Sequence, residues 1–218
     1  MITPTLKLEE ELWNKGFSCV CGLDEVGRGS FAGPVAAGAV VFPCNVILPE
    51  GIADSKLLTP KRREKLTVQI KEVALAWSVA VVGVSYINKL GIGKATQMAF
   101  RKAVRNLHPR PDYILFDAFY NFRSAKISSF AYIKHLNRKR QKPVKDGDKI
   151  CASISAASII AKFYRDNLMK KLHQKYPQYG LAKHKGYGTG EHQEAIKRYG
   201  LSRIHRKSFN LTRFTTND

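Results

Sequence analysis

Acidic residues are scarce in this chain of 218 residues, which contains 17 Asp and Glu against 37 Lys and Arg and therefore carries a net charge of +20 at pH 7. The shortage is uneven, because residues 1–100 contain 11 basic and 9 acidic residues, whereas residues 101–218 contain 26 and 8. So large and asymmetric a positive surplus favours a polyanionic partner, most economically nucleic acid, although a membrane surface or simple solubility would also fit.

Cysteines are also few, and none has the C-x-x-C or Cys–His spacing that would indicate a zinc site. The four are Cys19, Cys21, Cys44 and Cys151. Cys19 and Cys21 lie two residues apart on an expected strand, so both face the same side, and neither has an obvious partner for a disulfide. We therefore expect buried, reduced thiols in a cytoplasmic protein.

Long hydrophobic runs are absent as well. No segment approaches the roughly 20 consecutive apolar residues that a membrane-spanning helix requires. The N-terminal segment 1–13 contains three consecutive Glu residues and no apolar core, so it is unlike a signal peptide. We expect no membrane partner.

The remaining composition is that of a globular protein, 44% hydrophobic and 25% charged, in a length that suits one domain. Apolar runs predict strands at 17–24, 32–42, 74–84, 113–116 and 130–135, and helical spacing predicts helices at 4–15, 59–72, 94–107, 153–171 and 190–199. This order indicates an α/β fold with a mixed sheet flanked by helices. We expect a single domain over residues 1–218, with a core at about 17–175 and a helical C-terminal extension at about 176–212.

The segment from Cys21 to Pro34 carries the strongest chemical signal. It runs from an apolar stretch into the adjacent carboxylates Asp24 and Glu25 and then into Gly27-Arg28-Gly29. Charged groups at the end of a buried strand are costly unless a cation compensates them, and glycines let the backbone approach a ligand closely. The segment therefore indicates a metal and a phosphate. Adjacent strand residues face opposite ways, so both carboxylates reach one site only if the strand bends or bulges at Glu25.

Two further carboxylates occupy comparable positions. Asp117 ends the fourth expected strand, and Asp148 precedes the longest expected helix, whose first turns hold small residues that allow close packing on the sheet. Because ligands gather at strand ends in α/β sheets, Asp117 converges with Asp24 and Glu25 if the first and fourth strands are neighbours. Four acids without His or Cys form a hard oxygen site that suits Mg²⁺ or Mn²⁺. For Asp117 taken alone, a surface or capping role fits about equally well.

Taken together, these blocks resemble the type 2 ribonuclease H family, specifically ribonuclease HII. The blocks appear in the family's order and are residues 24–34, Asp54-Ser55-Lys56-Leu57, Ala95-Thr96 with Met98-Ala99, Phe116-Asp117, Gly147-Asp148, residues 155–162, His184-Lys185-Gly186-Tyr187-Gly188-Thr189 and residues 200–209. The resemblance spans about residues 17–210, and the combination of blocks is highly specific.

The resemblance implies an RNase H-like fold and a divalent-metal-dependent endoribonuclease. Such enzymes cut the RNA strand of RNA–DNA hybrids, and the 5′ side of a ribonucleotide embedded in duplex DNA, leaving 5′-phosphate and 3′-hydroxyl ends. The family's catalytic, metal-binding carboxylates correspond to Asp24, Glu25, Asp117 and Asp148, which would hold two Mg²⁺ or Mn²⁺ ions. Its ribonucleotide-contacting segment corresponds to Gly27, Arg28 and Gly29, and its deoxyribose-stacking tyrosine to Tyr187.

Basic side chains near these blocks are expected to position the substrate. Lys56, Lys185 and Arg206 lie in or beside family-like blocks, and we expect them to contact nucleic-acid phosphates, which fix register without reading sequence. The basic cluster at residues 138–145 either makes similar contacts or is a solvated loop, and the sequence favours neither interpretation.

Other features are less directly tied to the chemistry. We expect the histidines to be structural or phosphate-facing, since a carboxylate metal site needs none; they are His184, His192 and His205. Two departures from the family pattern, Ala118-Phe119 and Gly91-Ile92, put local substrate contacts in question and leave the carboxylates untouched.

Two alternatives remain at this point. Ribonuclease HIII shares the fold and the carboxylates, but it usually adds an N-terminal domain and commonly lacks the arginine that is Arg28 here; this chain has only about sixteen residues before the first strand. A non-catalytic basic RNA-binding protein explains the charge but leaves the four acids at strand ends unexplained. A monomer is the default expectation.

Overall fold

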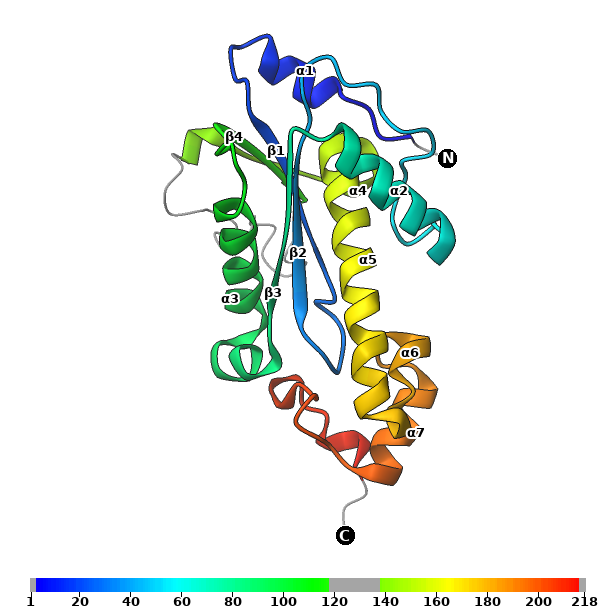
Figure 1. The fold of residues 1–218 in the computed structure, drawn as a ribbon. Helices are drawn as coiled ribbons and strands as arrows, with labels where there is room; N and C mark the ends of the chain where they lie inside the picture. The colour runs from blue at the N-terminus through cyan, green and yellow to red at the C-terminus, as the bar shows by residue number, and fades with distance from the viewer. Residues whose placement is uncertain (1–2, 118–137, 216–218) are drawn as a thin grey trace.

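The structure, a computed structural model, describes residues 3–117 and 138–215. Its centre is a five-stranded sheet in the order β3-β2-β1-β4-β5 (Figure 1). The strands are β1 (Val20–Val26), β2 (Val35–Val41), β3 (Ala76–Val82), β4 (Tyr113–Asp117) and β5 (Gln141–Val144). β1 and β3 each pair antiparallel with β2, whereas β4 pairs parallel with both β1 and β5. The predicted mixed sheet is confirmed.

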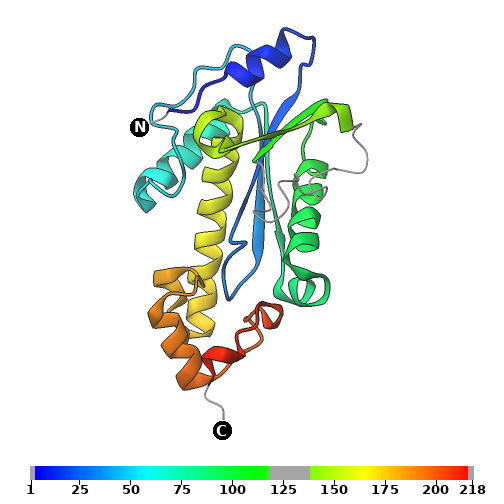
Figure 2. The same cartoon turned by 180° about the vertical axis from the view of Figure 1, so that it is seen from behind.

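Helices cover both faces of the sheet. They are α1 (Lys7–Trp13), α2 (Pro60–Val73), α3 (Val84–Arg105), α4 (Gly147–Ile150), α5 (Ala152–Lys175), α6 (Leu181–His184) and α7 (Gly190–Tyr199). α3 lies on one face and α5 on the other, with α2 beside α5 (Figure 1). The view from behind shows that the segments after α5 gather at its C-terminal end (Figure 2). No helix in the two described ranges is both long and apolar enough to cross a membrane.

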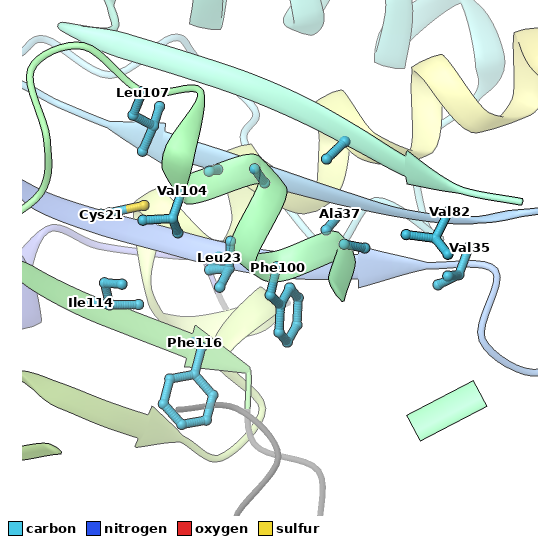
Figure 3. Packing of buried hydrophobic residues seen from close by; sticks show 14 of the residues in the cluster. Cys21, Leu23, Val35, Ala37, Val82, Phe100, Val104, Leu107, Ile114 and Phe116 are labelled. Atoms are coloured by element: carbon cyan, nitrogen blue, oxygen red, sulfur yellow. The ribbon is translucent and has the colours of Figure 1, made fainter. Parts of the chain in front are cut away.

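The face covered by α3 holds the larger hydrophobic cluster. Leu23 of β1 and Phe116 of β4 belong to one buried cluster with Phe100 and Val104 of α3 (Figure 3). The residues that alternate with these along β1 face α5 instead. Each strand thus presents one set of side chains to each helix, and this fixes which face of the sheet every residue at a strand end occupies.

α5 approaches the sheet unusually closely because glycines face it. A Cβ atom added at Gly22 of β1 would lie 2.1 Å from the carbonyl carbon of Ser153, and one added at Gly38 of β2 would lie 2.2 Å from the carbonyl oxygen of Ala157. Such distances do not occur between real atoms, so any larger residue would push the helix away. The prediction that small residues allow the long helix to pack closely is confirmed.

Three sequence expectations differ from the structure. The helix predicted at 94–107 is the second part of α3, which begins ten residues earlier, at Val84, and is interrupted at Gly91, where φ is 76°. β5 replaces part of the predicted basic loop. The sequence did not predict it because Lys142 and Pro143 are atypical of a strand. A proline is tolerated there because β5 lies at the edge of the sheet. Cys44 is exposed, whereas the other three cysteines are buried as expected.

Two expectations cannot be compared with the structure. The strand predicted at 130–135 and the departure at Ala118-Phe119 lie outside the described residues. The division into a core at about 17–175 and a C-terminal portion at about 176–212 stays a prediction.

Candidate active site

Asp24 and Asp117 are brought together by the parallel register of β1 and β4. Leu23 pairs with Phe116, so the next residue on each strand is one of the two aspartates. Leu23 and Phe116 both face α3, and alternation therefore directs Asp24 and Asp117 to the α5 face. The predicted convergence at neighbouring strand ends is confirmed.

Asp148 joins them through a tether to Asp117. Asp146 adopts the left-handed conformation with φ 52°, and the following amide of Gly147 donates to Asp117 Oδ1 at 2.8 Å. This bond fastens α4 to the end of β4 and places Asp148, the second residue of α4, beside the strand ends. The buried Asp148 carboxylate accepts a hydrogen bond from Lys56 Nζ at 3.1 Å.

A cleft of about 590 Å³ collects nearly every residue that the sequence singled out. Its lining includes the four carboxylates Asp24, Glu25, Asp117 and Asp148, the segment Gly27, Arg28 and Gly29, and the side chains of Lys56, Lys185 and Tyr187. Residues from β1, β4, α4, the loop before α2 and the segment after α6 thus share one concave surface. Arg206 does not line it.

Three carboxylates in this cleft, Asp24, Glu25 and Asp117, have raised pKa values. Burial, together with the nearby charges of Asp117 and Asp148, raises the pKa of Asp24 to about 7, although a hydrogen bond from Ser158 lowers it in part. Burial raises the pKa of Asp117 to about 6, against the stabilising Gly147 amide. Burial and the charge of Asp24 raise the pKa of Glu25 well above its usual range. A bound cation would relieve this mutual repulsion.

Glu25 reaches the cleft differently from the way the sequence predicted. The ladder between β1 and β2 continues without interruption through the pairs of Asp24, Glu25 and Val26, so the expected bend or bulge at Glu25 is wrong. Alternation places the Glu25 side chain on the α3 face at the strand end, where it still lines the cleft. Its Oε2 atom is buried and has no hydrogen-bond partner among the described residues.

The donor set fits a hard divalent cation even though the described residues hold no group of three or more acids, histidines or cysteines already gathered close enough to bind a metal. All four candidate ligands are carboxylates, three of them with raised pKa values. The orphaned Glu25 oxygen is a buried acceptor that a metal would satisfy. Oxygen-only sites of this kind suit Mg²⁺ or Mn²⁺.

The Gly-Arg-Gly turn is shaped from behind by two buried arginines. Gly27 has a φ of +88°, and a Cβ atom there would lie 1.9 Å from Arg165 Nε. Arg165 Nε donates to the carbonyl oxygen of Pro34 at 3.0 Å. Gly27 is therefore required by the packing of the protein itself, in addition to any role in ligand approach.

The structure corrects the prediction for Arg206. This side chain is fully buried and donates from its three nitrogens to the carbonyl oxygens of Arg28, Gly33 and Pro34, at 2.7, 2.9 and 3.1 Å. Burial lowers the pKa of Arg206 to about 9, and the nearby Arg165 contributes. Arg206 holds the turn in place from the interior and does not reach the surface that a substrate contacts.

Tyr187 forms the other end of the cleft. It is half-buried between Gly186 and Gly188, and its ring lies near two cations, with the Arg165 guanidinium carbon 5.5 Å and Lys162 Nζ 5.8 Å from the ring centroid. These contacts hold the ring at the cleft wall. Lys185, two residues earlier, adopts a left-handed conformation with φ 53° and also lines the cleft.

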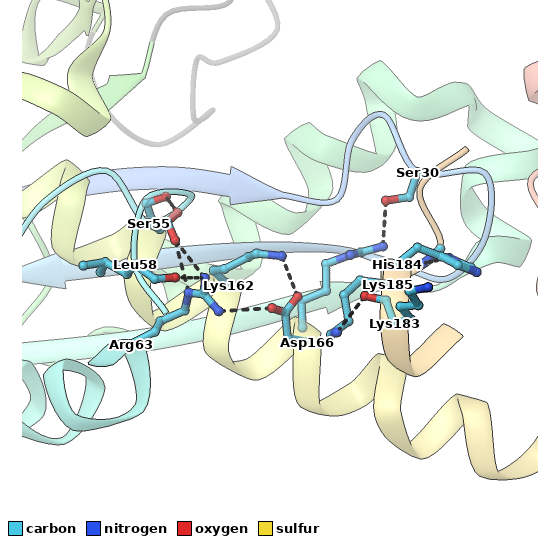
Figure 4. A network of polar contacts seen from close by, with 12 residues as sticks. Ser30, Ser55, Leu58, Arg63, Lys162, Asp166, Lys183, His184 and Lys185 are labelled. Atoms are coloured by element: carbon cyan, nitrogen blue, oxygen red, sulfur yellow. Dashed lines mark hydrogen bonds and ion pairs between the residues drawn. The ribbon is translucent and has the colours of Figure 1, made fainter. Parts of the chain in front are cut away.

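Sequence reasoning missed a polar row along α5. Ser158, Lys162 and Asp166 all line the cleft and are spaced by four residues, which places them on one face of the helix. Asp166 accepts from Lys162 at 2.7 Å and from Arg63 of α2 at 3.3 Å (Figure 4). The i, i+4, i+8 spacing of these three polar residues, which begins within the small and apolar first turns of the helix, is the signal that could have identified them as one face.

Comparisons with known proteins identify the family and the fold that this chain shares. Residues 21–212 match the family model described as Ribonuclease HII. The chain is 45% identical over 214 residues to the ribonuclease HII of Dehalococcoides mccartyi, a match that covers 95% of this chain and 93% of that relative. It superimposes on the crystal structure of ribonuclease H2 from Pyrococcus horikoshii with a TM-score of 0.73 and 30% identity, covering 89% of this chain and 95% of that one.

A more distant solved structure shares the same fold. Bst-RNase HIII in complex with Mn²⁺ has a TM-score of 0.69 to this chain at 22% identity, covering 90% of this chain and 68% of the other. At that identity the match speaks for the shared fold alone.

Proposed function

The chain belongs to the ribonuclease HII family, and we propose that it hydrolyses the RNA strand of RNA–DNA hybrids and nicks duplex DNA on the 5′ side of embedded ribonucleotides. The observation that carries this proposal is the shared cleft. Four carboxylates, a Gly-Arg-Gly turn and a tyrosine line one surface, so groups suited to phosphodiester hydrolysis adjoin groups suited to recognising a sugar.

The carboxylates would hold two Mg²⁺ or Mn²⁺ ions. The charges of both Asp117 and Asp148 act on Asp24, so we propose that Asp24 would contact both ions, with Asp117, Asp148 and Glu25 completing the set of ligands. When bound, such ions supply activation of the attacking water and stabilisation of charge on the leaving 3′-oxygen. The protein's contribution is to keep these acids buried and close together, so that they bind cations in place of protons. The products would carry 5′-phosphate and 3′-hydroxyl ends.

Recognition of RNA requires a group aimed at the 2′-hydroxyl, the chemical difference between the two sugars. Gly29 is exposed and Gly27 lies in the cleft wall, so main-chain atoms of the turn are accessible to a sugar. Arg28 would contact the adjoining phosphate. Tyr187, at the opposite wall, would stack on the deoxyribose just 3′ of the ribonucleotide.

Lysines complete the contacts with the backbone of the substrate. The side chain of Lys56 is 73% exposed, and its ammonium group contacts Asp148. Lys56 is therefore open to solvent while it lies next to the carboxylates. Lys185 lies beside the tyrosine segment. We propose that both contact phosphates, which would position the scissile bond without reading sequence.

An Asp24→Asn variant tests the assignment. We expect the loss of a charge at the centre of the carboxylate set to lower hybrid cleavage by at least about 100-fold, because catalytic electrostatic contributions are of that size. The measurement is Mg²⁺-dependent cleavage of an RNA–DNA hybrid, with circular dichroism to confirm the fold. Near-normal cleavage with unchanged Mg²⁺ dependence would overturn the assignment.

A duplex containing a single ribonucleotide separates the alternatives. A ribonuclease HII nicks it 5′ to that residue, a ribonuclease HIII-like enzyme prefers longer RNA stretches, and an RNA-binding module leaves it intact. We infer the first outcome from the presence of Arg28 and from the family match. We further propose a monomer that acts in the cytoplasm, where its cysteines stay reduced.

A further inference from the structure

Three histidines pack together beside the tyrosine segment, and one of them, His184, also lines the cleft. His184, His192 and His205 are all buried. The rings of His184 and His192 stack with centroids 4.5 Å apart, and those of His192 and His205 are 5.4 Å apart. They come from α6, α7 and the segment after α7, so the cluster joins three separate parts of the C-terminal portion.

The partners of His205 and His192 determine which ring nitrogen carries the proton. The Ser202 amide donates to His205 Nδ1 at 3.0 Å, so this nitrogen is the acceptor and Nε2 carries the hydrogen. His205 Nε2 lies 3.2 Å from His192 Nε2, which must therefore accept. His192 is left with its hydrogen on Nδ1, which lies 2.9 Å from the carbonyl oxygen of Tyr187 and donates to it.

His184 is fixed in the same way. The Gly186 amide donates to His184 Nδ1 at 3.2 Å, so the hydrogen resides on Nε2, which donates to the Tyr179 carbonyl oxygen at 2.7 Å. The Gly186 amide and the Tyr187 carbonyl are thus both held by neutral imidazoles. These two groups flank the Tyr187 side chain on the main chain.

We propose that His205 and His192 form a neutral hydrogen-bond relay, running from the Ser202 amide to the Tyr187 carbonyl, that positions Tyr187 in the cleft. They are positioning residues, because they act through Tyr187 and touch no substrate. The inference rests on the proposed stacking of Tyr187 on the deoxyribose. A second proton on His192 would occupy Nε2 and place two hydrogens between the two Nε2 atoms, and a second proton on His205 would occupy Nδ1 and face the Ser202 amide, so either would break the relay.

Heteronuclear NMR of the imidazole nitrogens tests the relay without any activity measurement. We expect His205 as the Nε2–H tautomer, His192 as the Nδ1–H tautomer and His184 as the Nε2–H tautomer, all neutral at pH 7. The exposed His108 serves as the solvent-facing reference signal. A doubly protonated His192 or His205, or the opposite tautomer at either, would overturn the relay even if Tyr187 acts as proposed.

Kinetics then test whether the relay serves Tyr187. His192→Leu removes the donor to the Tyr187 carbonyl, and we expect it to lower kcat/KM about tenfold on a duplex with one ribonucleotide. His192→Asn keeps a donor near the position of Nδ1 and should restore activity to within about threefold. In the Tyr187→Ala background, His192→Leu should cause no further loss, since both changes remove the same function.

The outcomes distinguish the two proposals. An additive loss in the double variant, with the fold intact by circular dichroism, would show that His192 acts on something other than Tyr187 and would overturn the inference. If Tyr187→Ala alone leaves junction cleavage unchanged, the proposed role of Tyr187 fails, and the positioning role of the relay fails with it. The NMR result would still decide whether the hydrogen bonds exist.

Discussion

At the scale of single residues, Arg206 has a structural role. Its guanidinium holds three carbonyl groups of the segment 28–34 from the protein interior. A lysine retains the charge but cannot direct donors along three fixed directions. We expect Arg206→Lys to lower the free energy of unfolding by about 1–3 kcal/mol, because one ammonium group cannot serve the carbonyls of Arg28 and Gly33 together, whereas the Pro34 carbonyl keeps its hydrogen bond from Arg165.

Urea unfolding measures this loss, and Arg213→Lys at an exposed position is the matched control. Equal stability of the two variants would contradict this structural role.

Nearly all of the other predicted site residues line the cleft, because they lie in contiguous motifs whose residue types indicate their chemistry. Arg206 also sits in such a motif, but sequence position does not reveal that a basic side chain points inward.

The histidine relay has a consequence for stability against pH. Burial lowers the pKa of both His192 and His205 to about 4, from an ordinary value of 6.5. The folded protein therefore favours the neutral rings, and their stabilising contribution is complete above about pH 6.5 and is lost as the pH falls toward 4. The raised pKa values of Asp24 and Asp117 act in the opposite direction, so the histidine contribution is isolated by comparing a variant with the wild type. We expect the urea midpoint of His205→Gln, relative to that of the wild type, to rise as the pH falls from 7 to 4.5. An identical slope in that variant would contradict this origin.

At the scale of secondary-structure elements, the contact between α5 and the sheet decides whether the site forms. The strands β1 and β4 could be predicted because each is an apolar run ending in a carboxylate. The start of α5 could not be understood from the sequence alone, since its Ser153 amide donates to Glu9 of α1 at 2.8 Å, a partner 144 positions away. Likewise, only the fold shows that Gly22 lies under that helix.

Gly22→Ala should therefore weaken the attachment of α5. The added methyl would meet the main chain of Ser153, which cannot yield as a flexible side chain would. We expect a loss of about 1–3 kcal/mol in unfolding free energy, with a parallel loss of activity as the helix shifts from the carboxylates. Gly93→Ala in α3 is the control, because nothing lies within 4 Å of its added Cβ. If both variants unfold at the same denaturant concentration, close packing is not what glycine provides at position 22.

At the scale of the whole molecule, the uneven charge governs binding. Residues 101–218 hold 26 of the 37 basic residues, so the half of the chain that supplies the tyrosine end of the cleft also supplies most of the positive field. If about four phosphates are neutralised, affinity for a hybrid should fall on the order of 100-fold between 50 and 200 mM salt. Fluorescence anisotropy with Ca²⁺ in place of Mg²⁺ measures this slope.

A double variant tests the open question of the basic cluster at 138–145. Lys142 and Lys145 are both exposed. We expect Lys142→Gln with Lys145→Gln to reduce the slope of log affinity against log salt by about 0.9 for each phosphate contact removed. An unchanged slope would show that Lys142 and Lys145 are solvated and contact no phosphate.

The continuous helix α5 carries groups of both ends of the cleft. Ser158 hydrogen-bonds to Asp24 at the carboxylate end, and Arg165 lies against Tyr187 at the other. They are seven residues apart, or about 10 Å along the axis of a rigid helix. α5 therefore fixes the distance between the carboxylate end of the cleft, where the bond would be cut, and the Tyr187 end, where the sugar would be recognised. Inserting one residue between Ser158 and Arg165 would move Arg165 by about 1.5 Å along the helix axis and rotate it by about 100°. The two ends of the cleft therefore cannot be repositioned independently.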